Sequence, residues 1–348
     1  LCTHEGGPVA RRLSDAGVRV AVGGGRAEGW RTWLREAAPD VVSTHFAGLE
    51  VLEVLAEHGA PIVETVQTTY AWFDDADWAR ERLKMQTLSA TVAVSDIVAS
   101  YHAQHTGGAL TPFRIPNAVD PGRAAAAPRE WARRRLGLPA HAPVFVHHGR
   151  IARQKNLAGL VRAFARTHRS CPEARLVLAG PRSERAYAKE MRAVAPELFR
   201  SGAVRVLPPV RHVGALLAAA DAYVSDSFFE GWSVAASEAA WVGLPLILSD
   251  CGGSRELVGE DGARGVVIPN PVGDPLSVAP RVIRMPPTEA SRVNEEAMAD
   301  AMTRMTEARS DWRDRSDVIR RGARALVAPD TMAGAYAAVY RQLAEAFG

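Results

Sequence analysis

Residues 144–164, VFVHHGRIARQKNLAGLVRAF, predict a strand, a glycine turn and a helix in direct succession. The run at 144–149 is apolar and continuous, as a strand covered on both faces of a parallel sheet requires. Gly149 permits a tight turn, and an amphipathic helix is expected over 156–170. The stretch therefore predicts a βα unit whose loop, 149–156, lies at the carboxyl end of its strand.

The same alternation of short apolar runs and amphipathic helices extends in both directions. Toward the C-terminus we expect further strands at 174–181, 204–210, 221–227, 244–250 and 264–270, with helices at 185–202, 213–220 and 232–243. Toward the N-terminus we expect strands at 18–24, 39–46, 60–66, 90–95 and 113–117, with helices at 9–17, 29–38, 49–59 and 96–107. Two such series predict an α/β protein of two doubly wound, Rossmann-like halves.

The boundaries of these halves follow from composition. An Ala/Pro-rich segment at 121–143 indicates a linker and a short helix, which places the domains at 1–122 and 123–330. Within the second domain, 277–320 predicts two exposed helices without an assigned function. The last helix, 331–348, must pack on another element because an apolar stripe runs along it. The stripe consists of Met332, Tyr336, Val339, Tyr340 and Leu343.

Composition excludes several classes of protein. A net charge of +3 is too small to indicate nucleic-acid binding, and no nucleic-acid-binding motif is present. No apolar run approaches the ~18 residues that a membrane span needs. Cys2, Cys171 and Cys251 form no Cys-x-x-Cys pair, which fits a reducing compartment. We therefore expect a cytoplasmic protein without membrane contact, and the oligomeric state stays open. The opening LCTHEGG lacks the features of a signal peptide and does not start with Met, so we expect an incomplete or trimmed N-terminus.

The loop GRIARQKN (149–156) is the first candidate site. The helix N-terminus that follows it offers unpaired N–H groups and a positive dipole end. Arg150 can grip a phosphate bidentately, while Lys155 acts as a mobile point charge. A diphosphate fits such a loop, and the alternative is a pair of solvated cations. The loop matches neither GxxxxGK[ST] nor GxGxxG.

The segment SFFEGWSVAASEAAWVGLPLILSDCGG (227–253) is the second candidate. Glu230 follows a strand and Glu238 lies two turns into the next helix, so the two carboxylates could hold two hydroxyl-bearing groups of one long ligand. The alternative is two solvated glutamates near a helix N-terminus. Backbone N–H groups that suit phosphate come from Gly231, Trp232 and Ser233.

These two segments resemble the donor motifs of the retaining glycosyltransferases of family 4. The resemblance rests on Glu230-x7-Glu238, on GRIARQKNLAGLVRAF (149–164) and on their order and spacing; RIPNAVD (114–120) is similar to the family's interdomain PNGVD, with Ala118 in place of the glycine. The resemblance implies the GT-B fold, in which two Rossmann-like doubly wound domains face each other across a cleft. It also implies that the final helix crosses back to the first domain.

The resemblance also implies roles for the residues at the candidate donor site. Arg150 and Lys155 would neutralise the diphosphate of a nucleotide sugar as the sugar leaves, and Gly149 with the backbone of 231–233 would lie near sugar and phosphate. Glu238 would hold the ribose hydroxyls and Glu230 the donor hexose. The implied transfer retains the anomeric configuration and requires neither a metal nor a cofactor besides the nucleotide sugar, with UDP ahead of GDP as the carrier.

The first half departs from the family. Gly6 and Gly7 resemble its N-terminal glycine loop, which faces the donor phosphate and the acceptor, but they stand in the unusual context CTHEGGP. Gln67 occupies the place of a frequent histidine; it can hydrogen-bond a sugar hydroxyl but cannot act as a base. His45 is the remaining histidine at a strand end, with a packed or loop histidine as the alternative.

Aromatic side chains in the same half are candidates for acceptor binding. Tyr70, Trp72 and Phe73 form a patch that suits sugars and other rings, although ordinary core packing explains it equally well. The neighbouring Asp74, Asp75 and Asp77 are interpreted as a solvated loop, because no Asp-x-Asp signature ends a strand.

The sequence thus predicts a hexosyltransferase. Its substrates would be a nucleotide-diphosphate sugar and a hydroxyl on a small-molecule, natural-product or saccharide acceptor. Two alternatives stay open: a nucleotide-sugar epimerase on the same fold, and a non-catalytic partner that binds nucleotide or carbohydrate.

Overall fold

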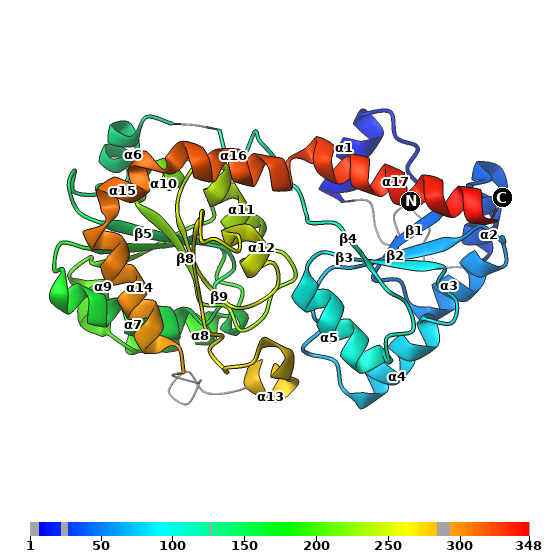
Figure 1. Cartoon of the computed structure of the whole chain (residues 1–348), viewed down its shortest axis with the longest axis horizontal. Helices are drawn as coiled ribbons and strands as arrows, with labels where there is room; N and C mark the ends of the chain where they lie inside the picture. The colour runs from blue at the N-terminus through cyan, green and yellow to red at the C-terminus, as the bar shows by residue number, and fades with distance from the viewer. Residues whose placement is uncertain (1–6, 22–26, 126, 284–292, 348) are drawn as a thin grey trace.

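The computed structural model describes residues 7–21, 27–125, 127–283 and 293–347, which form two parallel sheets flanked by helices. Figure 1 shows the two α/β halves side by side, joined by the linker and by the C-terminal helix. The two-domain α/β architecture expected from the sequence is confirmed.

The first domain holds a parallel sheet of order β1-β2-β3-β4. Its strands are β1 (Val42–His45), β2 (Ile62–Val66), β3 (Ala90–Ala93) and β4 (Phe113–Arg114). Its helices are α1 (Pro8–Asp15), α2 (Ala27–Ala37), α3 (Leu49–Ala56), α4 (Asp75–Lys84) and α5 (Asp96–Thr106). The predicted strand at 18–24 is absent over 18–21, and its remaining residues lie outside the described part of the chain.

Helix α4 corrects the interpretation of Asp74, Asp75 and Asp77 as a solvated loop. The Asp74 carboxylate accepts from the backbone N–H of Asp77 at 2.9 Å, and the Asp77 carboxylate accepts from the Asp74 N–H at 3.3 Å. This reciprocal pair is a capping box, and the acidic residues also complement the positive end of the helix dipole. The cluster therefore starts a helix.

The second domain holds a parallel sheet of order β10-β9-β8-β5-β6-β7. The strands are β5 (Val144–His148), β6 (Arg175–Ala179), β7 (Val204–Leu207), β8 (Ala222–Ser225), β9 (Leu246–Ser249) and β10 (Gly265–Ile268). Counted from β5 in chain order, this is the Rossmann arrangement, and the direction of winding reverses between β5 and β8. Ligands of such sheets bind at the carboxyl ends of the strands at that switch point.

Helices cover both faces of the second sheet (Figure 1). One face packs against α10 (Gly214–Ala219), α11 (Val234–Trp241), α12 (Ser254–Val258) and α16 (Ser316–Val327). The other packs against α7 (Leu157–Ser170), α8 (Arg185–Ala193), α9 (Pro196–Arg200) and α14 (Glu295–Glu307). Shorter helices are α6 (Arg129–Arg135), α13 (Pro280–Ile283) and α15 (Arg309–Asp314), and 3-10 turns span Arg153–Lys155 and Pro275–Ser277.

The segment 277–320 differs from its prediction as two exposed helices. Met298, Met302 and Met305 of α14 are buried, and this stripe packs against α7. An i, i+4, i+7 pattern places the three side chains on one helix face, so α14 belongs to the core of the second domain.

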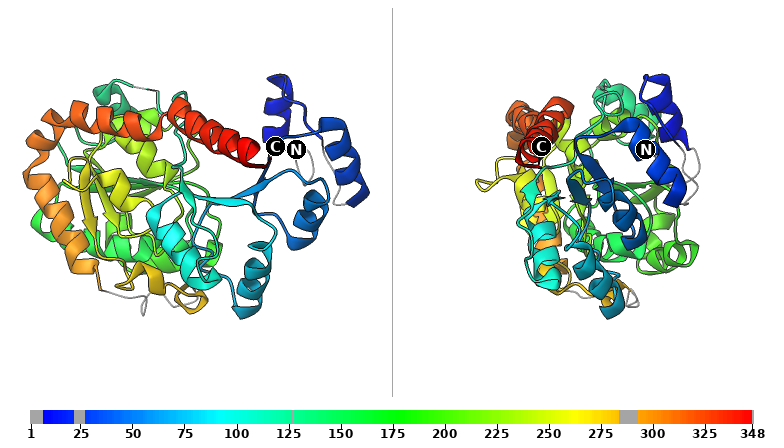
Figure 2. Two further views of the ribbon diagram at one scale, coloured as in Figure 1. Left: turned by 45° about the vertical axis from the view of Figure 1, so that its right-hand side comes forward. Right: turned by 90° about the vertical axis from the view of Figure 1, so that its right-hand side faces the viewer.

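The C-terminal helix α17 (Pro329–Phe347) crosses from the second domain onto the first (Figures 1 and 2). A proline at its first position separates it from α16. Val339 and Leu343 are buried against the first sheet, and the other stripe residues pack beside them, so the predicted apolar stripe is confirmed. The Val119 N–H donates to the Val327 carbonyl at 3.0 Å, so the two interdomain crossings of the chain lie side by side.

Candidate active site

Two loops meet at the switch point between β5 and β8. Residues 149–156 follow β5 and residues 226–233 follow β8. Gln154 joins them, because its carbonyl accepts from the Phe228 N–H at 2.9 Å and its Nε2 donates to the Phe229 carbonyl at 3.0 Å. The two sequence-predicted segments thus form one site at the carboxyl edge of the sheet.

Close backbone packing supports the first of these loops. A Cβ on Gly180 would lie 1.8 Å from the Gly149 carbonyl oxygen, so only glycine fits at position 180. The Gly149 N–H donates to the Ala179 carbonyl at 2.9 Å, which continues the β5–β6 pairing past the end of the strand. The start of the loop 149–156 is therefore fixed against the end of β6.

Lys155 and Glu230 form an ion pair between the two loops, from Nζ to Oε1. Ser227 donates its hydroxyl to the same carboxylate oxygen at 2.7 Å. The side chains of Lys155 and Glu230 are 15% and 11% exposed, so the pair is mostly buried at the carboxyl edge of the sheet. Asn156, in the left-handed conformation, caps α7 and ends the 3-10 turn that carries Lys155.

Arg150 is exposed at the start of the same loop. It donates to Gln154 Oε1 at 2.7 Å and has no carboxylate partner among the described residues. A bound anion could therefore recruit Arg150 without breaking an ion pair.

Glu238 lies on α11 and is held by two side chains that the sequence did not single out. Arg123 donates through Nε to Oε1 at 2.8 Å, and His148 Nε2 lies 2.7 Å from Oε2. Burial raises the pKa of the Glu238 carboxyl, but the hydrogen bonds from His148 and Arg123 outweigh burial and lower it below its ordinary value. Glu238 is thus an oriented carboxylate. In the sequence, the only feature that could have indicated His148 as a partner of Glu238 is its position directly before Gly149.

Trp232 and Ser233 shape the start of α11. Trp232 is buried, its Nε1 donates to Ser237 Oγ at 2.9 Å, and a Cβ on Gly253 would meet its ring at 2.1 Å. Ser233 is the N-cap and accepts from the Ala236 N–H at 3.3 Å. Both side chains are engaged within the protein, so any part they play in donor binding falls to their backbone.

Gly231 brings the second domain against the first. A Cβ on Gly231 would lie 1.7 Å from the Gln67 carbonyl oxygen, which belongs to the loop after β2. Gly252 packs behind it, where a Cβ would lie 2.4 Å from the Gly231 carbonyl oxygen. The loop after β8 and the first domain therefore touch through backbone.

Polar side chains at the carboxyl ends of the first sheet form a short chain of contacts. Gln67 Nε2 lies 3.3 Å from His45 Nδ1, and Asn117 Nδ2 donates to Gln67 Oε1 at 3.0 Å. His45 and Gln67 are thus neighbours beside Gly231. Asn117, from the RIPN segment after β4, is a further polar residue at this edge.

The other predicted residues of the first domain separate into different environments. Tyr70 is buried and stacks on Phe73 with ring centroids 4.8 Å apart, so it is a core residue. Trp72 is 46% exposed and its ring lies 6.1 Å from that of Phe229 in the second domain. Gly7 is the N-cap of α1, with no atom near its Cβ position, and Gly6 lies outside the described residues.

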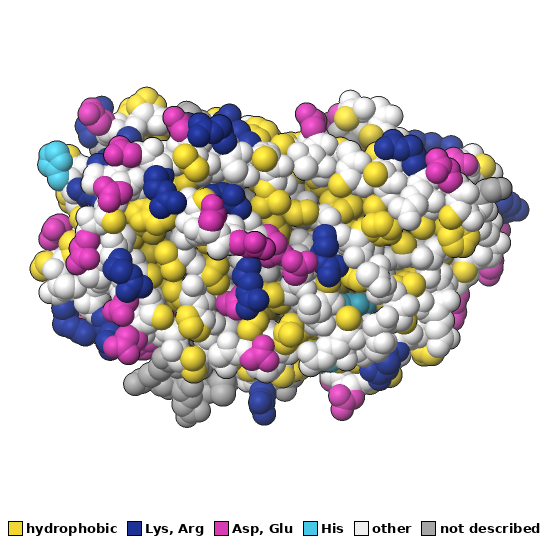
Figure 3. Space-filling model, in the orientation of Figure 1, with side chains coloured by type: hydrophobic (Ala, Val, Ile, Leu, Met, Phe, Trp, Pro, Cys, Tyr) yellow, Lys and Arg dark blue, Asp and Glu magenta, His cyan; other side chains and the backbone are white. Residues whose placement is uncertain are grey.

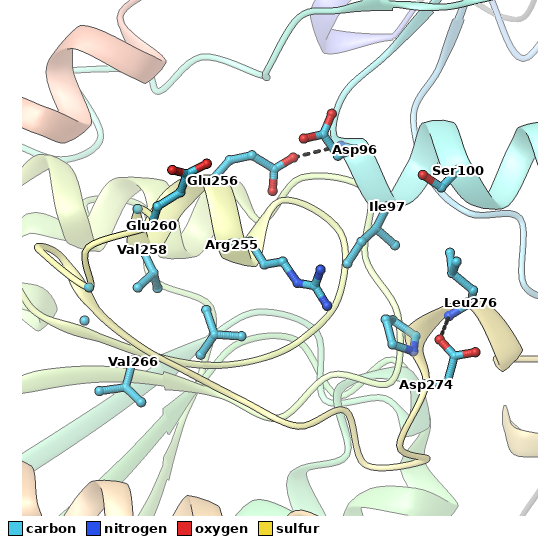
Figure 4. A pocket seen from close by; sticks show the side chains of 15 residues that line it. Asp96, Ile97, Ser100, Arg255, Glu256, Val258, Glu260, Val266, Asp274 and Leu276 are labelled. Carbon is cyan, nitrogen blue, oxygen red and sulfur yellow. Dashed lines mark hydrogen bonds between the residues drawn. The ribbon is translucent and has the colours of Figure 1, made fainter.

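A separate hollow of about 860 Å³ lies between the domains, at α5 and α12 (Figure 4). Figure 4 shows Glu256 reaching the first turn of α5, where it accepts from the Asp96 N–H at 2.8 Å. Arg255 and Asp274 line the same hollow. None of the lining residues is among those predicted for the donor, so this hollow is distinct from the two loops at the switch point.

Some classes of site have no support in the described part of the chain. No group of three or more His, Cys, Asp or Glu side chains there could hold a metal ion, and no helix there is long and apolar enough to cross a membrane. Acidic and basic side chains are interspersed on the face shown in Figure 3, without one continuous basic stripe.

Two family models match the chain. The model of glycosyl transferases group 1 matches residues 128–286, and that of glycosyltransferase family 4 matches residues 9–123. Among curated proteins, the chain is 31% identical over 204 residues to the alpha-maltose-1-phosphate synthase of Mycolicibacterium smegmatis. That alignment covers 54% of this chain and 50% of the relative. The chain spans about half the length of the curated relatives it matches.

Solved structures share the fold. A glycosyltransferase from Rickettsia africae superposes with a TM-score of 0.77 at 14% identity, covering 97% of this chain and 88% of the other. The Anabaena protein HepE, in complex with UDP and glucose, superposes with a TM-score of 0.63 at 21% identity, covering 90% and 88%. The expected GT-B fold is therefore confirmed.

Proposed function

The chain belongs to the glycosyl transferases of group 1, and on that premise we propose that it transfers a hexose-type sugar from a nucleotide-diphosphate sugar. The acceptor is a hydroxyl group of a small molecule, a natural product or a saccharide. The observation that carries the proposal is the Lys155–Glu230 ion pair at the switch point between β5 and β8. Arg150, which has no carboxylate partner among the described residues, is on the same loop.

Donor binding reorganises this ion pair. A diphosphate brings negative charge to the N-terminus of α7, where Lys155 exchanges its carboxylate for phosphate oxygens and Arg150 joins it. Glu230, released from Lys155, is then an acceptor for hydroxyl groups of the sugar. One movement of the lysine thus prepares both the phosphate and the sugar ends of the donor site.

Glu238 holds the ribose in this proposal. Its carboxylate oxygens each have a second lone pair beside the contacts to Arg123 and His148, and hydroxyl groups of a ribose can donate to these. UDP stays ahead of GDP as the carrier, and the fold shared with a protein that binds UDP and glucose supports that order.

The chemical step needs charge neutralisation more than proton transfer by a side chain. As the bond between the anomeric carbon and the phosphate oxygen breaks, Arg150 and Lys155 stabilise the negative charge on the leaving diphosphate. The acceptor hydroxyl attacks on the face from which the diphosphate leaves, its proton passes to a phosphate oxygen, and the configuration is retained. The two cations take the part that a metal ion would otherwise play.

The first domain positions the acceptor. His45, Gln67 and Asn117 lie at its carboxyl edge next to Gly231, and Trp72 presents an exposed ring beside Phe229. Polar groups beside an aromatic face are suited to a hydroxyl-bearing ring.

The test is steady-state transfer with a panel of nucleotide sugars and acceptors. We compare Glu230→Ala and Arg150→Ala with Arg341→Ala, an exposed arginine on α17, as the control. Both site variants should lose turnover while folded and the control should retain it; full turnover in either site variant would refute the assignment. Conversion of the sugar without an acceptor would indicate an epimerase, and donor binding without turnover on any acceptor would indicate a non-catalytic partner.

A further inference from the structure

A basic hollow lies on α8, behind the loop 149–156. It has a volume of about 680 Å³, and its walls are α8 with the preceding loop and the end of β7. Four cationic side chains line it, and the floor is apolar. The cations are Arg182, Arg185, Lys189 and Arg192, and the floor includes Val206, Leu207, Pro208 and Pro209.

The helix geometry explains why the cations gather there. Arg185, Lys189 and Arg192 are at positions i, i+4 and i+7, which share one face of α8. Tyr187 and Met191, on the other face, are buried in the domain core. Packing of the apolar face therefore fixes the basic face toward the hollow.

The acidic residues of α8 are bound elsewhere. The Nη2 of Arg153 donates to both carboxylate oxygens of Glu190, at 2.9 and 2.7 Å, and Arg153 forms a longer ion pair with Glu184 at 3.8 Å. The four cations of the hollow have no ion-pair partner among the described residues; Arg192 only lies over the Phe199 ring, at 5.3 Å. The acidic side chains of this helix are thus paired with Arg153, and among the described residues none of them neutralises the cations of the hollow.

The hollow is distinct from the proposed donor site. Helix α8 covers one face of the sheet, whereas α11, which carries Glu238, covers the other. The two sites share a wall, because Gly180 lines the hollow and packs against Gly149 of the donor loop. A ligand in the hollow would therefore lie next to Gly180, which packs under the loop 149–156, without occupying the proposed donor site.

We propose that this hollow binds a small phosphorylated molecule that carries at least two negative charges. Guanidinium groups grip phosphate bidentately, and a lysine adds a movable charge. A concave site lined by four cations without an ion-pair partner among the described residues, and by apolar side chains, matches a compact anion with a small organic part. Two sources provide this chemistry: a phosphate group of the acceptor, or a free phosphorylated effector.

Calorimetric titration with inorganic pyrophosphate tests the site. The probe is titrated into the wild type, into Arg185→Gln/Lys189→Gln, into Arg150→Gln/Lys155→Gln, and into Arg321→Gln/Arg341→Gln. The last pair removes two exposed cations far from α8, which controls for net charge and ionic strength.

We expect the α8 double variant to lose binding about tenfold or more at the hollow, because charge-assisted hydrogen bonds are strong. The donor-loop variant should keep that site, and the control should match the wild type. Equal binding by the α8 variant and the control would overturn the inference. Loss of binding only in the donor-loop variant would also overturn it, while supporting the donor site.

Transfer assays then separate the two sources. If the hollow holds a phosphate of the acceptor, the α8 variant raises KM for the phosphorylated acceptor and leaves KM for its unphosphorylated form unchanged. If it holds a free effector, pyrophosphate changes the rate of the wild type with an unphosphorylated acceptor, and this response disappears in the α8 variant.

Discussion

Each domain contains a lysine in a buried ion pair, but Lys84 in the first domain has two carboxylate partners and Lys155 in the second has one. In the first domain, Lys84 contacts Glu64 at 2.6 Å and Glu81 at 2.9 Å, with its side chain 6% exposed. In the second domain, Lys155 has Glu230 as its carboxylate partner and is 15% exposed at the edge of the sheet.

The network around Lys84 is complete within the core. Thr44 donates to Glu64 at 3.0 Å, and His102 Nε2 lies 3.1 Å from Glu81. Burial lowers the pKa of Lys84, but the two carboxylates outweigh burial and raise it, so the ammonium form is held firmly. No ligand could enter without breaking several contacts at once, and the network is structural.

The Lys155–Glu230 pair is less enclosed than the Lys84 network. It joins two loops at the switch point, and Arg150, which has no carboxylate partner in the described part of the chain, is on the same loop as Lys155. An anion can replace Glu230 as the partner of Lys155 without entering the core. A buried ion pair therefore indicates function where it joins loops at the switch point of a sheet and has few other contacts.

The largest effect on stability is expected from Lys84→Met. It leaves Glu64 and Glu81 buried without their cation, and breaking a buried pair costs about 3–5 kcal/mol. Chemical denaturation should show a large loss of unfolding free energy, with normal turnover per folded molecule at low temperature. A loss of turnover without a loss of stability would show that the first-domain network acts in the site.

The matched change Lys155→Met should give the reverse pattern. Removing a cation that stabilises the leaving diphosphate should lower kcat by about 10²–10³-fold. The change in unfolding free energy should be smaller than for Lys84→Met, because Lys155 is more exposed and leaves one carboxylate, not two, without its cation. If both lysine variants lose mainly stability, the contrast between the two networks fails.

Gly231→Ala should have the next largest effect on turnover. A Cβ at this position would lie 1.7 Å from the Gln67 carbonyl oxygen, so the two domains must move apart where they touch. Misplacement by about 1 Å can cost ~10²-fold in rate. Gly334→Ala is the control, since its Cβ would meet open space. Equal kinetics for the two variants would show that the contact between Gly231 and Gln67 does not affect turnover.

The smallest effect concerns pH. The pKa of Glu238 is lowered from its ordinary value of 4.5, so its stabilising contribution is present above about pH 4.5 and is lost as the pH falls through the folded-state pKa. The stability difference between wild type and Glu238→Gln should therefore shrink in acid. Glu345→Gln, an exposed change on α17, should show a difference that does not vary in this way. A constant difference for Glu238→Gln would contradict the clamp by His148 and Arg123.

Local sequence was sufficient for the parts of the fold that depend on local patterns. The βα units of the second domain and the helix predicted at 96–107 follow from apolar period and turn residues, and the structure has them. Helix α4 was not predicted, because the acidic residues at its start were interpreted as a solvated loop and not as a helix cap. The Met298, Met302 and Met305 stripe was available in the sequence and would have placed α14 in the core.

The candidate site likewise has residues that the sequence predicts and contacts that only the folded chain creates. Lys155 and Glu230 were named from motif positions, and the structure brings them together. Arg123 as the partner of Glu238 could not be predicted, because the two residues are 115 positions apart and only the folded linker brings them into contact. The approach of Gly231 to Gln67 likewise depends on how the two domains meet.

The central claim is that the loop 149–156 and Glu238 bind a nucleoside diphosphate. Thermal unfolding of the wild type and Lys155→Met with UDP, GDP, ADP and TDP tests it most directly. A ligand at about 100 times its dissociation constant adds about 2.7 kcal/mol of stability, which raises the midpoint by a few degrees in a chain of this size. We predict a rise with UDP for the wild type and a much smaller one for Lys155→Met. No rise with any of the four nucleotides in a well-folded wild type would contradict the claim.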